Sequence, residues 1–318
     1  MAKTVSKTVK KSAATTGTKT PPRELASVLD FVRYAVTRFT DAKLAFGQGT
    51  HDAVEEAIFL VTESLGLPHD RVDSFLPARL TAAECKKVFG LIETRVRQRV
   101  PAAYLLNCAY LQGHRFYVDK RVIVPRSYLS ELLYGDLFTG EQPLIDPGAV
   151  TNVLELCTGS ACLAILACDI FPNAHVDAVD LSKDALDVAK INVAEHGLED
   201  RITLMKGDLF APVGDTVYDI ILTNPPYVDA EAVADFPPEF TKEPRMAHAG
   251  GDDGLDIVRR ILAEAGAHLN PEGGLLCEIG RGRDILERDY PETEFLWLDT
   301  AESSGEVFWL PATALQDD

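Results

Sequence analysis

Apolar runs of strand length alternate with amphipathic stretches of helix length from residue 152 to the end of the chain. This alternation is typical of a doubly wound α/β fold, in which helices cover both faces of a mostly parallel sheet. In such sheets, ligands bind at the carboxyl ends of the strands, near the point where the strand order reverses. We expect seven strands, at 152–157, 175–180, 201–206, 217–223, 274–279, 294–299 and 306–310, and helices at 160–170, 183–195, 255–269 and 283–290.

Polar signals follow each of the first three expected strands. The segment 155–161 turns sharply from a strand into a helix, and its small residues allow a ligand to approach the backbone closely. Asp180 ends the next strand about 20 residues later, where a carboxylate can accept hydrogen bonds from ribose hydroxyls. Asp208 and Leu209 follow the third strand and suit an adenine, which would lie between an acceptor and an apolar surface. The alternatives are a tight turn, a helix cap and a loop acid.

The motif Asn224-Pro225-Pro226-Tyr227 directly follows the apolar run 218–222. Because proline has no backbone N–H, this loop concentrates acceptors, namely the Asn224 side-chain oxygen and the Pro225 carbonyl. Two aligned acceptors hold a planar NH2 group and favour the pyramidal, partly positive nitrogen that forms when this nitrogen attacks. Tyr227 would offer a flat face to the group and to a cationic methyl donor. The motif indicates methyl transfer to an amide or amino nitrogen, and it equally suits a rigid turn.

Together these motifs resemble the class I S-adenosylmethionine-dependent methyltransferases of the protein-glutamine methyltransferase group. The resemblance covers nearly the whole chain after residue 22. It favours the branch that methylates a glutamine of large-subunit ribosomal protein three. The branch that acts on peptide-release factors usually has Pro-Arg-Pro, an acidic residue, Thr and Glu where this chain has Pro-Arg-Ser-Tyr-Leu at 125–129, and glycine in place of Cys157. The segments that resemble the ribosomal-protein branch are 100–105, 116–119, 122–127, 131–133 and 250–256.

The resemblance implies a role for each matching residue. Thr158, Gly159 and Ser160 would lie near the methionine part of S-adenosylmethionine, Asp180 at its ribose, and Asp208 with Leu209 around its adenine. The implied catalytic residues, which surround the substrate glutamine, are Asn224, Pro225, Pro226 and Tyr227. The implied cofactor-binding residues are Glu155, Cys157, Thr158, Gly159, Ser160, Asp180, Leu181, Asp208, Leu209 and Asn224.

Ala161 departs from the family pattern, which has glycine at this position. A methyl group at the crowded start of the helix would weaken cofactor binding if the glycine serves close packing. If the backbone is ordinary helix, alanine is harmless or even favourable. We expect the harmless case, because Ala161 falls inside the expected helix rather than at the turn.

Composition limits the class of protein. The 318 residues, 46% of them hydrophobic, are enough for two domains. No run approaches the length of a membrane span, and the basic first residues lack the apolar core of a secretory signal. The six cysteines form no CxxC pair and the seven histidines are scattered, which indicates reduced thiols, a cytoplasmic protein and no metal. Cys157 has no activating neighbour in the sequence, so we expect it to pack rather than react.

Charge separates the substrate classes, because DNA adenine methyltransferases also use Asn-Pro-Pro-Tyr loops. Residues 1–22 carry five Lys and no acid, whereas residues 116–318 carry 14 Lys and Arg against 38 Asp and Glu. Nucleic-acid affinity normally depends on basic side chains that neutralise phosphates. The acidic half therefore favours a basic protein partner and no direct contact with DNA, although acidity also serves solubility.

Four segments are expected along the chain: a disordered basic tail at 1–22, a helical substrate-recognition domain at 23–100, a β-hairpin linker at 101–125 and the methyltransferase domain at 126–318. A capping-box pattern, Thr81 to Glu84, opens one of the helices. Arg95, Arg97 and Arg99 are expected on the outer face of the helical domain, available to a substrate protein or to ribosomal RNA, or simply solvated.

The sequence thus predicts transfer of a methyl group to a glutamine amide of large-subunit ribosomal protein three, either free or within an assembly intermediate. Three alternatives stay open: glutamine methylation of release factors, adenine methylation of nucleic acid, and a non-catalytic ribosome-assembly factor. Glu278 ends the fifth expected strand, and we expect it to face solvent rather than border the site.

Overall fold

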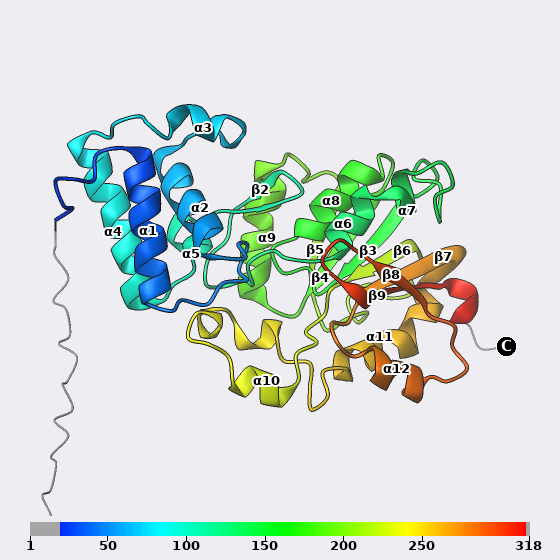
Figure 1. Cartoon of the computed structure of the whole chain (residues 1–318). Coiled ribbons are helices and arrows are strands. Elements are labelled where there is room, and N and C mark those ends of the chain that lie inside the picture. The colour runs from blue at the N-terminus through cyan, green and yellow to red at the C-terminus, as the bar shows by residue number, and fades with distance from the viewer. Residues whose placement is uncertain (1–19, 316–318) are drawn as a thin grey trace, which may run out of the picture.

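The computed structural model describes residues 20–315 and shows a helical part joined to an α/β part (Figure 1). The expected disordered tail at 1–22 lies, except for its last three residues, outside the described residues. No helix of the described chain is long and apolar enough to span a membrane. The helices of the first part are α1 (Val28–Asp41), α2 (Ala53–Leu65), η1 (His69–Arg71), α3 (Val72–Phe75), α4 (Ala82–Gln98) and α5 (Ala102–Leu106).

Side-chain caps define where the long helices of the helical part begin. Ser27 and Asp30 form a capping box at α1, and Asp52 accepts hydrogen bonds from two backbone N–H groups of α2. Thr81 and Glu84 form the expected capping box at α4. Such caps satisfy backbone donors that have no partner within the helix. The apolar faces of the three helices meet in one core.

Arg95 differs from the expectation of an outer-face arginine, because its side chain is fully buried. Its Nε donates to Glu56 Oε1 at 2.5 Å, and its Nη1 lies 3.6 Å from Glu239 Oε1. Arg95 lies on the apolar face of α4 with Val88 and Ile92, whereas Arg97 is half-exposed and pairs with Glu93. Arg99 Nη1 also reaches Glu239, at 2.8 Å. Two arginines of the helical part therefore hold an acid from the α/β part.

The linker contains a shorter hairpin than expected. Strands β1 (Ala109–Leu111) and β2 (His114–Phe116) pair antiparallel around Gln112-Gly113, where both turn residues have positive φ. Residues 102–106 form α5 instead, which packs on α2 and α4, and 117–128 run without regular structure. Ala102 packs in the core of the helical part, and Ala103 and Tyr104 pack against residues 109–124 and α9, which outweighs the alternating pattern.

The sheet has seven strands in the order β5-β4-β3-β6-β7-β9-β8. All neighbours are parallel except β9, which is antiparallel to both β7 and β8. This confirms the expected doubly wound α/β sheet. The strands are β3 (Asn152–Leu156), β4 (His175–Asp180), β5 (Ile202–Lys206), β6 (Tyr218–Thr223), β7 (Leu269–Glu278), β8 (Leu296–Asp299) and β9 (Ser304–Pro311).

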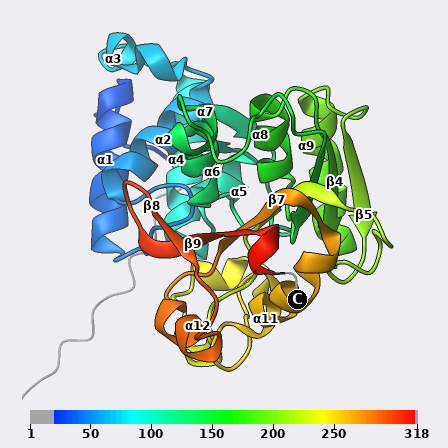
Figure 2. The same cartoon turned by 90° about the vertical axis from the view of Figure 1, so that its right-hand side faces the viewer.

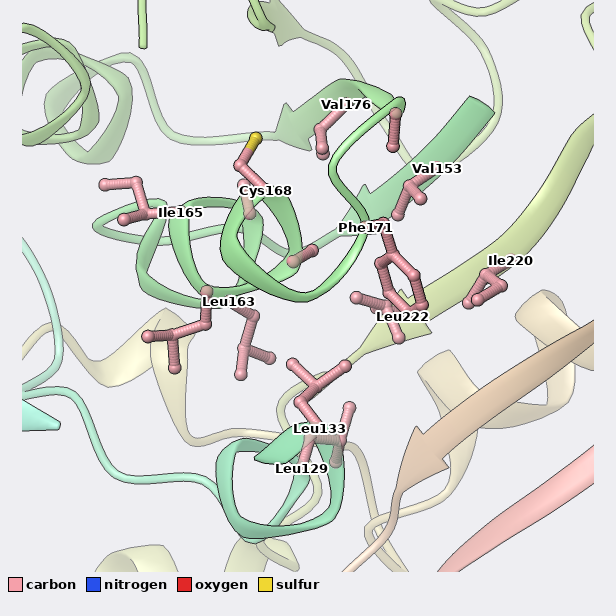
Figure 3. Close-up of a cluster of buried hydrophobic side chains, with 14 of the residues drawn as sticks. Leu129, Leu133, Val153, Leu163, Ile165, Cys168, Phe171, Val176, Ile220 and Leu222 are labelled. Atoms are coloured by element: carbon pink, nitrogen blue, oxygen red, sulfur yellow. The ribbon is translucent and has the colours of Figure 1, made fainter. Parts of the chain in front are cut away.

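Helices cover both faces of the sheet (Figure 2). One face packs against α6, α7, α8 and α9, and the other against α11 and α12. Figure 3 shows the first face, where Phe171 lies among Val153, Ile220 and Leu222 of the strands. The remaining elements are α6 (Leu129–Tyr134), α7 (Asp136–Thr139), α8 (Cys162–Ile170), α9 (Lys183–Glu195), α10 (Ala230–Ala234), η2 (Phe240–Lys242), η3 (Arg245–Ala247), α11 (Asp256–Ala265), η4 (Gly266–His268), α12 (Arg283–Asp289) and η5 (Ala312–Ala314).

The strand order reverses at the centre of the sheet. From β3 the chain goes to β4 and β5 on one side, then returns to β6 and β7 on the other. The two crossovers lie on opposite sides of β3, so the loops after β3 and β6 diverge and leave a crevice at their carboxyl ends. A functional site is expected there.

Arg95→Met should destabilise the protein by about 3–5 kcal/mol, because it leaves the buried Glu56 without a cation and Glu239 with Arg99 alone. Thermal unfolding monitored by circular dichroism measures the change. Arg97→Met serves as the control, since Arg97 is half-exposed and its loss should cost under about 1 kcal/mol. Small and equal decreases in melting temperature for the two variants would contradict the argument that Arg95 neutralises buried charge.

Candidate active site

A cavity of about 570 Å³ opens at the carboxyl ends of β3, β4 and β6. Residues 121–126 of the linker and residues 236–249, between β6 and α11, form its other walls. It brings together most of the residues singled out from the sequence: Cys157, Gly159, Asp180, Leu181, Asp208, Leu209, Asn224, Pro225, Pro226 and Tyr227.

Glu155, Thr158 and Ser160 do not line this cavity. All three are buried behind its wall, between β3 and α8. Glu155 Oε2 accepts from the Thr158 hydroxyl and, at 3.0 Å, from Ala164 N in the first turn of α8. The carboxylate therefore caps α8 and braces the turn from behind. Burial raises the pKa of Glu155 to about 8.

The β3–α8 turn contains three residues in the left-handed region, namely Cys157 (φ 59°), Gly159 (φ 56°) and Ala161 (φ 62°). A Cβ built on Gly159 meets no atom within 4 Å, so its backbone is open to the cavity. Gly159 N donates to Asp180 Oδ2 at 2.8 Å. Burial raises the pKa of the Cys157 thiol well above its usual range, which agrees with the expected packing role.

Ala161 corrects our expectation. It does not lie inside the helix but caps it, in the left-handed conformation, and its methyl group is fully buried. A side chain in this conformation costs about 1–2 kcal/mol, a cost that glycine avoids. The glycine that the family resemblance implies thus suits the turn, and Ala161 is tolerated because Ala161 N is hydrogen-bonded to Thr158 O and its methyl packs in the core.

Asp180 ends β4 with its carboxylate held by the backbone. Oδ2 accepts from Gly159 N, and Oδ1 accepts from Ser182 N at 2.7 Å. Each oxygen has a second lone pair, so the group can still accept hydrogen bonds from a ligand. Burial raises the pKa of Asp180 above its usual range, although the two backbone donors oppose this shift. Leu181, beside it, is 55% exposed and contributes apolar surface to the cavity.

Asp208 and Leu209 border the cavity next to Asp180. Leu209 is buried with φ 49°, and Gly207 N donates to Asp180 O. Asp208 is half-exposed and pairs with Arg260 of α11, Oδ2 to Nη2 at 2.9 Å. The arginine holds the Asp208 carboxylate at the mouth of the cavity.

The Asn224–Tyr227 loop faces the cavity from the end of β6. Asn224 Nδ2 donates to the Arg126 carbonyl at 3.3 Å, which fixes the orientation of the carboxamide. Asn224 Oδ1 accepts no hydrogen bond from the described residues and is available to a ligand. The Tyr227 hydroxyl donates to Glu278 Oε1 at 2.7 Å, so this hydrogen bond holds the phenol at its hydroxyl end.

Glu278 also differs from its expectation. It is 1% exposed rather than facing solvent, and it lies behind Tyr227 at the end of β7. The position of Glu278 at the end of a strand did not reveal that residues 126–128 cover its side chain. Burial raises the pKa of Glu278 to about 6.

Sequence reasoning missed the pair Arg126–Glu243, which crosses one wall of the cavity. The two Nη atoms of Arg126 contact the two Glu243 oxygens at 2.8 Å each. Glu243 Oε1 also accepts from Val124 N, and Glu243 Oε2 lies 3.1 Å from His248 Nε2. Burial opposes ionisation of Glu243, but Arg126 and His248 hold its pKa at about 2. Residues 236–249 lack any periodic pattern, so no signal marked Glu243 beforehand.

Aromatic and apolar side chains from residues 236–249 complete the same wall. Phe236, Phe240 and Met246 line the cavity, and the Arg126 guanidinium lies 5.7 Å from the Phe240 ring centroid. Met246 is 49% exposed. Within residues 20–315, no three His, Cys, Asp or Glu side chains gather in a way that could hold a metal ion.

Comparison with known proteins identifies the family. Residues 142–239 match the methyltransferase small domain model. A Bradyrhizobium diazoefficiens protein named ribosomal protein uL3 glutamine methyltransferase is 57% identical over 99% of this chain and 100% of its own. Proteins of the same name are 51% identical in Burkholderia pseudomallei, over 93% of this chain and 98% of that one, and 50% identical in Bordetella pertussis, over 91% and 96%.

These relatives confirm the resemblance to the protein-glutamine methyltransferases and the preference for the ribosomal-protein branch. They also make the chain an enzyme of the class I methyltransferases, a group that uses S-adenosylmethionine. With identity of this level over nearly the full length of both chains, this protein belongs to the ribosomal protein uL3 glutamine methyltransferase family.

Proposed function

We propose that this protein transfers a methyl group to the side-chain amide nitrogen of a glutamine in ribosomal protein uL3, in the cytoplasm. One observation carries the proposal: the acceptor-rich Asn224-Pro225 loop and the Asp180 carboxylate open into the same cavity. A site for a nucleoside and a site for a planar amide therefore adjoin each other, as direct transfer between two bound molecules requires.

The donor site would be formed by the ends of β3, β4 and β5. Asp180 retains acceptor capacity for the ribose hydroxyls, and the open backbone at Gly159 allows close approach of the ligand. Leu181 and Leu209 give apolar surface and Asp208 an acceptor for the adenine. These residues fit S-adenosylmethionine, which when bound supplies an electrophilic methyl group.

The acceptor site would be formed by Asn224 and Pro225. Asn224 Oδ1 and the Pro225 carbonyl can each accept one hydrogen of a glutamine NH2 group, while Asn224 Nδ2 stays bound to the Arg126 carbonyl. Holding both hydrogens pulls electron density toward the amide nitrogen and favours the pyramidal geometry of attack. The N-methylated nitrogen is strongly acidic while it carries its extra proton, so that proton can leave to water without a strong base.

Tyr227 would supply the flat face beside the amide. Its ring is partly exposed at the cavity and its hydroxyl is already bonded to Glu278, so the ring is held before substrate arrives. Phe236, Phe240 and Met246 on the facing wall would contact the residues that flank the glutamine. The Arg126–Glu243 pair holds that wall to the linker.

Charge favours uL3 over nucleic acid as the substrate. Residues 116–318 carry 38 acidic against 14 basic residues, which repels phosphates and attracts a basic ribosomal protein. Purified protein with labelled S-adenosylmethionine should therefore modify uL3, and neither duplex DNA nor a release factor, under identical conditions. Offering uL3 free and within an assembly intermediate distinguishes the two forms of the substrate. Label on the DNA or the release factor alone would refute the proposal.

Asn224→Ala should lower kcat by about 10²–10³-fold, because it removes one of the two oriented acceptors. The Kd for S-adenosylmethionine should change by less than about threefold. Radiolabel transfer to uL3 and isothermal titration calorimetry measure the two effects. Asn152→Ala, an exposed change at the opposite end of β3, is the control. A parallel loss of turnover and cofactor affinity in the Asn224 variant would reject the assigned role.

Asp180→Asn should weaken S-adenosylmethionine binding by about 10–100-fold, since it removes charge-assisted hydrogen bonds of about 1.5–3 kcal/mol. At saturating cofactor, kcat should recover to within about threefold of wild type. Asp184→Asn makes the same charge change on an exposed acid in the first turn of α9 and should leave the Kd unchanged. If both variants bind S-adenosylmethionine with the same Kd, Asp180 does not contact the ribose.

A further inference from the structure

Glu278 gathers three hydrogen-bond donors around one buried carboxylate at the end of β7. Its Oε1 accepts from the Tyr227 hydroxyl at 2.7 Å. Its Oε2 accepts from the Ser127 hydroxyl at 2.7 Å and from Tyr128 N at 3.0 Å. The carboxylate is 1% exposed, and no cation forms an ion pair with it within the described chain. These neutral donors therefore stabilise its charge.

The two sides of Glu278 belong to segments far apart in the sequence. Ser127 and Tyr128 come from the irregular segment just before α6, whereas Tyr227 ends the Asn-Pro-Pro-Tyr loop after β6. The same linker segment also holds the start of that loop, since the Arg126 carbonyl accepts from Asn224 Nδ2. Both ends of the acceptor loop are thus fastened to residues 126–128, one directly and the other through Glu278.

Gly280 fixes the remaining freedom of the Tyr227 ring. A Cβ built on Gly280 would lie 2.7 Å from the Tyr227 Cδ2 and Cε2 atoms, and Gly280 has φ 56°. The ring therefore lies directly against the backbone after β7, with its hydroxyl on Glu278. Because Gly280 contacts the Cδ2 and Cε2 atoms and Glu278 holds the hydroxyl, the Tyr227 ring can rotate little.

We propose that Glu278 is a positioning residue for methyl transfer, which holds Tyr227 against Gly280 and fastens the acceptor loop to residues 126–128. The inference rests on the proposed function, because it assigns to Glu278 the alignment of the site that binds the glutamine. Prolines 225 and 226 stiffen the loop internally, but its orientation relative to the cavity depends on these outside contacts. Misplacement by about 1 Å at a reacting centre lowers rates by about 10²-fold.

Glu278→Ala should lower kcat for uL3 by about 100-fold, with the Kd for S-adenosylmethionine within about threefold of wild type. Glu278→Gln keeps the shape and one acceptor oxygen, so its loss should be about tenfold or less. Glu272→Gln, an exposed acid at the far end of β7, is the matched control and should leave kcat unchanged. A merely structural role would instead lower the melting temperature and both parameters together.

A double-mutant cycle with Tyr227→Phe tests the coupling directly. Tyr227→Phe should lower kcat in the wild-type background but by less than about twofold in the Glu278→Ala background, since the hydroxyl then has no acceptor at position 278. The pH profile of the glutamine variant keeps the proposal falsifiable if the alanine variant does not fold. Independent, multiplicative effects of the two changes overturn the proposal, as does a Glu278→Ala enzyme with wild-type kcat.

The pH profile provides a second readout. The titratable groups facing Glu278 are Cys277 on β7 itself, Tyr227 after β6, Tyr128 before α6 and Glu306 on β9. Burial raises the pKa of Glu278 to about 6, and it raises the pKa values of Tyr227, Tyr128 and Cys277 above their usual range, so these three stay neutral near neutral pH. Protonation of Glu278 removes acceptor capacity, so kcat should fall as the pH drops through about 6.

The Glu278→Gln variant should lack this step, because glutamine does not titrate. An identical step in the two enzymes assigns it to another group and overturns this part of the inference. Failure of the proposed function is distinguishable, since the wild-type enzyme would then methylate no glutamine of uL3 at any pH. A wild-type enzyme that modifies uL3 and is unaffected by changes at Glu278 overturns the inference alone.

Discussion

β3 pairs in parallel with β4 on one side and β6 on the other, and this pairing decides where functional side chains can gather. The chain turns in opposite directions after the two central strands, so their loops part and leave the cavity between them. Asp180 reaches it from β4 and Asn224 from β6. Asp180 and Asn224 are therefore separated by the width of one strand, β3, which the sheet holds constant.

Buried carboxyl groups behind the cavity walls are the second recurring element. Glu155 caps α8 and braces the β3–α8 turn, Glu243 holds residues 124–126 to the facing wall, and Glu278 holds Tyr227. Glu243 is neutralised by Arg126, whereas Glu155 and Glu278 accept only from hydroxyl and backbone donors. Burial raises the pKa values of the latter two to about 8 and about 6. The loops around the cavity thus depend on carboxyl groups that are buried behind its walls.

Periodicity predicted the sheet well because parallel strands are buried on both faces and read as continuous apolar runs. β4 and α9 begin and end at the expected residues. Residues whose surroundings come from elsewhere in the fold were harder to predict. Arg95, Glu278 and Ala161 were each misjudged, because burial of the first two and the left-handed φ of the third arise from tertiary contacts. Glu243 lies in a segment with no pattern. Local sequence therefore located the loops that line the cavity but not the side chains that hold them.

The wall formed by residues 236–249 is joined to the helical part as firmly as to the sheet. Glu239 receives Arg99 and lies beside Arg95, its carbonyl accepts from Gln48 Nε2, and Phe240 lies close to Gly47. An isolated α/β half would leave the Glu239 carboxylate without its guanidinium neighbours and expose the back of Phe240. The helical part is consequently a support for one wall of the cavity, and exchanging it for that of a relative would replace the side chains on which this wall rests.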